Sequence, residues 1–139
     1  MNRQVLRIID ANLNRAGEGL RVLEEVSRLL LDDAAASQQL KDLRHELLRV
    51  DPQYYALIVA ARDASGDVGA DMAAAGDDYQ RGLPAIVTAN ARRVQESLRV
   101  LEELARLPEI NLETDRFRKA RFRLYTLEKE LLAGLEARK

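Results

Sequence analysis

The sequence predicts an all-α domain in which two duplicated helical hairpins, joined by a long central loop, form a four-helix bundle-like fold. Its 139 residues include 23 Leu and 20 Ala, whereas Val, Ile and Thr together number 17. Strands favour β-branched residues and helices favour Leu and Ala. Apolar residues also recur every three or four positions, and one segment is repeated along the chain. A chain of this length corresponds to a single domain, residues 1–139.

Prolines and apolar spacing mark where the helices begin and end. Asp33 is suited to start the second helix, which ends before Pro52. Pro84 suits the first turn of the third helix, and Pro108 follows its end. Apolar positions at helical spacing define the first and fourth helices. We therefore expect four main helices, over residues 5–31, 34–50, 84–107 and 114–137.

The central loop, residues 51–83, differs in composition from the rest. It contains six aspartates and four glycines, and only the apolar run 54–61 resembles a helix. Glycines and aspartates make 62–69 a turn-rich segment. Loops of this length within a compact domain are usually functional or disordered.

An internal repeat is the most informative feature. Residues 11–29 recur as 89–107, with 12 of 19 positions identical. A weaker similarity relates two later helical segments and aligns Arg44 with Arg121. The repeats therefore extend over about 5–50 and 84–137, and we expect them to pack about a pseudo-two-fold axis.

Composition excludes several classes of function. The chain has no cysteine, which excludes thiol nucleophiles, disulfides and Fe–S clusters. A net charge of −1 argues against non-specific nucleic-acid binding. No apolar run is long enough to span a membrane, and the first residues do not resemble a signal peptide. A cytoplasmic enzyme or binding domain is the expectation.

Polar residues fall within the apolar arc of the first helix. On a helical wheel, Asn12 and Arg15 lie inside this arc, Gly19 lies at its centre and Glu18 flanks it. Their equivalents in the repeat are Asn90, Arg93, Ser97 and Glu96. Buried Asn and Arg side chains cost several kcal/mol unless they are satisfied.

Two interpretations of this arc remain open. In the first, the residues form an internal network, in which Arg15 pairs with Glu18, Arg93 pairs with Glu96, and the asparagines cap or bridge the backbone. In the second, they hold a polar ligand at one end of the bundle. Gly19 either opens space beside Arg15 or allows a close approach of two helices.

A charged stripe is predicted on the far side of both long helices. We expect it to be a solvated face stabilised by pairs three and four residues apart, although it could also dock a partner. It comprises Arg21, Glu24, Arg28, Arg99, Glu102 and Arg106.

The central loop offers candidate metal ligands. Asp63 and Asp67, close to Arg62, could hold Mg²⁺ and a phosphate. The alternative is a polar turn in which aspartate side chains bind backbone amides.

Four segments together resemble one known family over nearly the whole chain. They read RIIDANLNRAGEGLRVLEEVSRLLLDD, LKDLRHELL, AARDASGDVG and NARRVQESLRVLEE. This pattern is similar to the monofunctional hydroxymethylpyrimidine-phosphate kinases, a helical domain fused to the N-terminus of some thiamine-phosphate synthases. Because the sequence stops at Lys139, the resemblance implies a stand-alone or an excised form of that domain.

The resemblance implies ATP-dependent conversion of 4-amino-5-hydroxymethyl-2-methylpyrimidine phosphate to its diphosphate, with ATP and Mg²⁺ as cofactors. The expected phosphate clamps are Arg15, Arg93 and Arg62, and the expected metal ligands are Asp63 and Asp67. The expected substrate-binding residues are Asn12, Asn90, Glu18 and Glu96.

Two other classes of function stay open. The same arginines could serve an ATP-independent helical enzyme that acts on a small dianion. The chain could instead be a ligand-binding or regulatory module associated with thiamine biosynthesis. A thiamine-phosphate synthase as a partner and a homodimer as the assembly are both compatible with the resemblance.

Overall fold

The protein is all-α, as the sequence predicted. The computed structural model describes residues 2–70, 72 and 82–139, and within these residues it contains five α-helices, one π-helical turn and no strand. The elements are α1 (Arg3–Glu25), η1 (Val26–Leu30), α2 (Ala34–Leu48), α3 (Pro52–Ala61), α4 (Leu83–Leu104) and α5 (Thr114–Ala137). The four long helices lie within a few residues of the predicted ranges.

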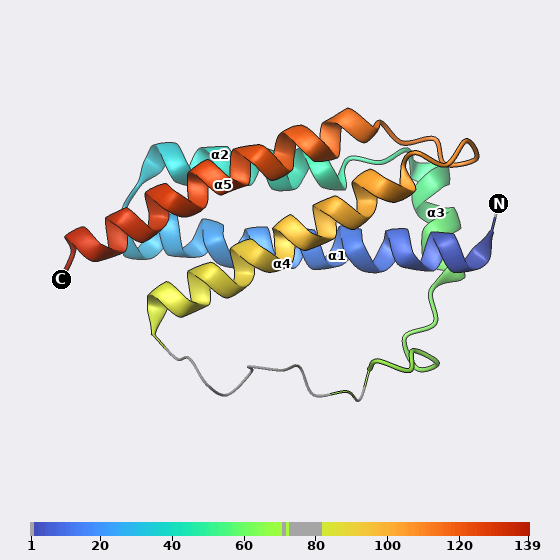
Figure 1. The fold of residues 1–139 in the computed structure, drawn as a ribbon, viewed down its shortest axis with the longest axis horizontal. Coiled ribbons are helices and arrows are strands. Elements are labelled where there is room, and N and C mark those ends of the chain that lie inside the picture. Colours follow the sequence, from blue (N-terminus) through green and yellow to red (C-terminus); the bar gives the residue numbers. More distant parts are fainter. Residues whose placement is uncertain (1, 71, 73–81) are drawn as a thin grey trace.

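The helices form two hairpins that pack face to face. α1 and α4 run in opposite directions and cross one another, and α2 and α5 cover them from the same side (Figure 1). The short helix α3 packs against α1. The largest fully buried side chains come from both hairpins and from α3: Ile9, Leu20, Leu23, Leu40, Leu47, Ile58, Leu98, Leu101, Phe117, Leu124, Leu127 and Leu131.

The two long helices approach each other closely at Gly19. A β-carbon built at this position would lie 2.5 Å from Val94 Cγ2 and 3.2 Å from the backbone oxygen of Asn90. Of the two interpretations of Gly19, close helix approach is therefore confirmed. The glycine does not open space beside Arg15.

The predicted solvated stripe is wrong at two positions. Glu24 is 4% exposed and Glu102 is 3% exposed. Glu24 pairs with Arg44 of α2 at 3.1 Å, and Glu102 pairs with Arg121 of α5 at 2.9 Å. The helical wheel identified only the apolar face of each long helix, which packs against the other long helix. The hairpin partner covers a further face of each long helix, so glutamates there become buried and need a cation.

Helix α3 lies in the segment predicted to be mainly loop. Its start is capped by Asp51, whose Oδ1 accepts a hydrogen bond from the backbone N–H of Gln53 at 2.7 Å. Pro52 follows at the first helical position. The helix buries Tyr54 and Ile58. The part of the predicted loop at 71 and 73–81 lies outside the described residues.

In the described part of the chain, none of the helices has both the length and the apolar character that crossing a membrane would require.

The crossing at Gly19 generates a stability prediction. Gly19→Ala forces the β-carbon against Val94, and overpacking of this kind costs typically about 1–3 kcal/mol. The gain in helix propensity, about 1 kcal/mol, offsets part of that cost. We expect a net loss of about 1 kcal/mol in the free energy of unfolding, measured by thermal or urea denaturation.

Gly17→Ala is the matched control on the same helix. There the new β-carbon meets the end of the exposed Leu48 side chain at 3.1 Å, and that side chain can move aside. Its stability should stay equal or rise. An equal loss in both variants would contradict the role given to the crossing.

Candidate functional site

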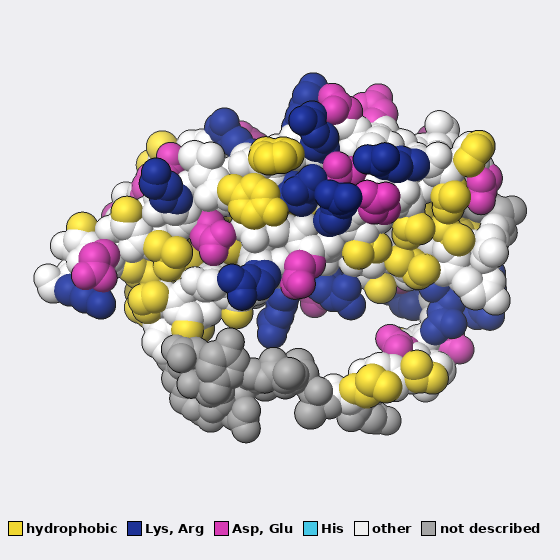
Figure 2. All heavy atoms as spheres, in the orientation of Figure 1, with side chains coloured by type: hydrophobic (Ala, Val, Ile, Leu, Met, Phe, Trp, Pro, Cys, Tyr) yellow, Lys and Arg dark blue, Asp and Glu magenta, His cyan; other side chains and the backbone are white. Residues whose placement is uncertain are grey.

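A cleft of about 590 Å³ lies between the N-terminal half of α1 and the loop that follows α3, and we call it the α1 cleft. Six residues singled out in the sequence line it: Asn12, Arg15, Glu18, Arg62, Asp63 and Asp67. Asn90, Arg93 and Glu96 lie on α4 and do not line this cleft. Figure 2 shows Lys and Arg side chains along the edge of the helical body that faces the loop.

The cleft wall is anchored by an ion pair that sequence reasoning missed. Arg62 donates hydrogen bonds from Nε and Nη2 to the Asp10 carboxylate, at 2.7 and 2.8 Å. Asp10 is 4% exposed. The hydrogen bond to Asp10, and next its negative charge, raise the pKa of the Arg62 guanidinium above its usual value. The pair therefore ties the end of α3 to α1.

Asp10 could not have been found by periodicity alone. It lies on the side of α1 opposite the apolar arc, where a wheel predicts solvent. α3 covers this side, and the contact joins residues 52 positions apart. The sequence signal for the pair Asp10–Arg62 was its opposite charges, and many other residue pairs of the chain also have opposite charges.

Arg15 and Arg93 were predicted to be buried, and this prediction is wrong: both are exposed. Asn12, by contrast, is 5% exposed. Arg15 lies towards the edge of the apolar arc, and its long side chain carries the guanidinium out to solvent. The shorter Asn12 side chain stays under the surface.

The two ends of the Asn12 carboxamide have separate partners. Its Nδ2 donates to the backbone oxygen of Ile8 at 2.8 Å. Its Oδ1 accepts from Nη1 of Arg15 at 3.1 Å. In the repeat, Asn90 donates in the same way to Ile86 at 2.9 Å. The asparagines thus bind backbone, as the network interpretation predicted, but Arg15 is bound by Asn12.

The loop carboxylates stabilise turns. Oδ1 of Asp63 accepts from the backbone N–H of Gly66, and Oδ1 of Asp67 accepts from that of Gly69, both at 2.8 Å. These are the contacts expected of the polar-turn interpretation. The second oxygen of each carboxylate has no hydrogen-bond partner among the described residues. Within those residues, no group of three or more metal-ligating side chains occurs.

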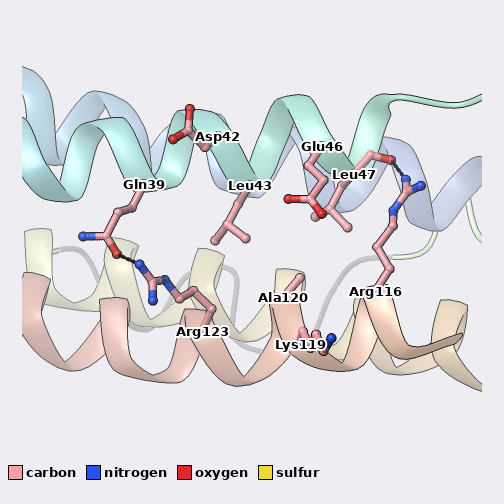
Figure 3. Close-up of a pocket in the computed structure, with 9 residues that line it drawn as sticks. All are labelled: Gln39, Asp42, Leu43, Glu46, Leu47, Arg116, Lys119, Ala120 and Arg123. Atoms are coloured by element: carbon pink, nitrogen blue, oxygen red, sulfur yellow. Dashed lines mark hydrogen bonds between the residues drawn. The ribbon is translucent and has the colours of Figure 1, made fainter. Parts of the chain in front are cut away.

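A second groove, of about 360 Å³, lies between α2 and α5 (Figure 3). Arg116 donates to the backbone oxygen of Leu47 at 3.0 Å, and Arg123 donates to Gln39. Asp42 and Glu46 line the same groove and offset the positive charges. These contacts tie the second hairpin to the first.

Comparison with known proteins identifies relatives of the chain. The model of the ThiD2 family matches residues 7–130. The chain is 37% identical over 141 residues to a thiamine-phosphate synthase of Rhodopirellula baltica, and 42% identical over 137 residues to that of Thermosynechococcus vestitus. A thiamine-phosphate synthase of a Synechocystis strain is 39% identical over 130 residues.

These alignments cover nearly all of the chain but only part of each relative. They include 99%, 98% and 94% of this chain and 37%, 38% and 37% of the three synthases, in the same order. The chain thus spans a little over a third of the length of these relatives. No solved structure matches it.

The contact between Arg62 and Asp10 generates a prediction about the cleft wall. Arg62→Gln removes the charged donors from a buried carboxylate and releases the start of the loop. We expect a lower midpoint of thermal unfolding and several-fold faster cleavage within residues 62–70 by a protease of broad specificity. Arg28→Gln, at an exposed arginine of η1, should leave both unchanged. Equal cleavage rates in the two variants would contradict the anchoring role.

Proposed function

The chain belongs to the ThiD2 family, and on that basis we propose that it is a kinase. The reaction proposed is ATP-dependent conversion of 4-amino-5-hydroxymethyl-2-methylpyrimidine phosphate to its diphosphate. The names of the relatives support a role in thiamine biosynthesis. The observation that carries the proposal is the α1 cleft, because it combines arginine donors with carboxylate oxygens that could hold a cation.

The reaction requires neutralisation of negative charge more than it requires proton transfer. The nucleophile is a phosphate oxygen that is already anionic, so no strong general base is needed. Catalysis of phosphoryl transfer rests on positioning and on neutralising charge. The phosphate clamps proposed are Arg15, Arg93 and Arg62. Since two Arg62 nitrogens bind Asp10, its third nitrogen is the one proposed to reach phosphate.

The cleft fits a divalent cation on the chemistry of its donors. Three arginines line it, Arg7, Arg15 and Arg62, against four carboxylates, Asp10, Glu18, Asp63 and Asp67. Without a cation, the excess of negative charge among these side chains would repel a polyanion. Mg²⁺ is bound in proteins by one or two carboxylates together with substrate phosphates. Asp63 and Asp67 would hold it through their second oxygens, and the cation would neutralise the triphosphate.

Amide and carboxylate groups suit the pyrimidine. Glu18 is exposed at the cleft and can accept a hydrogen bond from an exocyclic amino group. Asn90 and Glu96 are proposed to contribute from α4. Asn12 supports binding through Arg15, because both ends of its carboxamide are engaged within the protein.

The decisive experiment is coupled ADP release by the purified protein, with and without the pyrimidine phosphate. The kinase proposal expects release that requires both the acceptor and Mg²⁺. Conversion of the phosphate without ATP or Mg²⁺ would favour an ATP-independent enzyme. Ligand binding without turnover would favour a regulatory module. Adding a thiamine-phosphate synthase tests whether the proposed partner accepts the product directly.

Arg15 and Arg93 carry the first prediction of this proposal. Arg15→Gln and Arg93→Gln should each lower turnover by at least about tenfold, since arginines that stabilise transferring phosphoryl groups contribute far more than this. Arg92→Gln changes the neighbouring exposed arginine of α4 and should retain activity. If both variants fold and keep full turnover, Arg15 and Arg93 are structural.

Asp67 carries the second prediction. Asp67→Asn keeps the oxygen that caps the turn at Gly69 but removes the negative charge. The Mg²⁺ concentration that gives half-maximal activity should rise by at least about tenfold, the loss typical of altered metal sites. Asp42→Asn, at an exposed carboxylate of the other groove, is the control. An unchanged Mg²⁺ titration would make Asp67 a turn residue only.

A further inference from the structure

We propose that Arg7 is a further phosphate-binding residue of the α1 cleft, and that Arg7 and Arg15 form a two-point site for phosphoryl oxygens. This inference rests on the proposed function for the class of its ligand. Its geometry rests on contacts that involve neither ATP nor a metal.

The partners of the cleft arginines separate them into two kinds. Arg62 binds the carboxylate of Asp10, which neutralises its charge. Arg7 donates from Nη2 to the backbone oxygen of Asp63 at 3.3 Å, and Arg15 donates from Nη1 to the amide oxygen of Asn12 at 3.1 Å. Both of those acceptors are neutral. Among the residues described, no carboxylate oxygen lies within 4 Å of either guanidinium.

This difference decides which arginines bring an uncompensated charge to an anion. The charge of Arg62 is already neutralised by Asp10, so its third nitrogen can add a hydrogen bond to phosphate but little net charge. An arginine held by a neutral oxygen keeps its full charge and most of its donors while its position is fixed. Arg7 and Arg15 are therefore oriented without being neutralised, which is the state that favours a phosphate ligand.

The spacing along α1 fits two separate phosphoryl contacts. Eight residues of α-helix place the two Cα atoms about 12 Å apart along the axis. Both side chains line the same cleft, with Asn12 and Ile8 between them. A chain of linked phosphates, or two phosphates held end to end, could therefore contact one arginine at each end.

Asn12 is suited to its part in this site because an amide both donates and accepts. Its Nδ2 is bound by the backbone oxygen of Ile8, so its oxygen is turned towards Arg15. An aspartate there would oppose the carbonyl and neutralise Arg15. The asparagine thus orients the guanidinium and leaves its charge available.

The test measures binding of inorganic tripolyphosphate by calorimetry with saturating Mg²⁺. Arg7→Gln and Arg15→Gln should each weaken binding by about tenfold, the loss of about 1.4 kcal/mol expected of one charge-assisted contact. Arg7→Lys, which keeps the charge but loses the planar fork, should fall between wild type and Arg7→Gln. Thermal unfolding verifies that each variant is folded.

Arg3→Gln is the matched control. It removes the same charge from the same helix, four residues earlier, at an exposed position that does not line the cleft. Its affinity should stay within about twofold of wild type, because exposed charges at a distance are screened. If Arg7→Gln binds as tightly as Arg3→Gln, Arg7 only supports the loop and the inference is overturned.

The outcomes separate this inference from the proposed function. Tripolyphosphate binding that depends on Arg7, without any ADP release, would overturn the kinase and retain the two-point site. ADP release by the wild-type protein, together with unchanged tripolyphosphate binding by Arg7→Gln, would retain the kinase and overturn the two-point site. A wild-type protein that does not bind tripolyphosphate overturns the two-point site.

Discussion

Gly19 lets α1 and α4 approach until a single added carbon would lie 2.5 Å from Val94. This close crossing fixes how the two hairpins sit against each other, because each long helix also packs against its own hairpin partner. With α1 and α4 crossed at this point, α2 and α5 lie side by side and cover both long helices from the same side (Figure 1). The buried pairs Glu24–Arg44 and Glu102–Arg121 then follow. Close-packed protein interiors tolerate little shift at such a contact.

The two repeats share several contacts but differ in their surroundings. Equivalent asparagines bind equivalent carbonyls, and equivalent glutamates bind equivalent arginines. The first hairpin is followed by α3 and its turn-forming loop, which bring Arg62 and Asp63 beside α1. The described cleft thus combines one repeat with the segment that connects the two hairpins. A duplicated scaffold with one added segment can assign different tasks to two identical polar patterns.

Sequence patterns predicted the fold more completely than the site. Helical spacing and proline positions located the long helices to within a few residues, since these signals are local. The wheel failed for Glu24 and Glu102, because burial of that face depends on a partner helix about twenty residues away. It failed for Arg15 because side-chain length, as well as angle, decides exposure. The pair Asp10–Arg62 joins residues 52 positions apart, and one sequence offers no local signal for it. None of these patterns contained the chemistry proposed for the cleft, and that proposal rests on the family to which the chain belongs.

The order of contacts along the chain has a consequence for how the protein folds. The ion pairs within each hairpin join residues 20 and 19 positions apart, whereas the crossing at Gly19 and Val94 closes a loop of 75 residues. Closing a longer loop costs more chain entropy, and contacts of low sequence separation form faster. Each hairpin can therefore collapse before the two dock. The pair that anchors the cleft, Asp10–Arg62, joins residues 52 positions apart, so we expect it to form after the contacts within each hairpin.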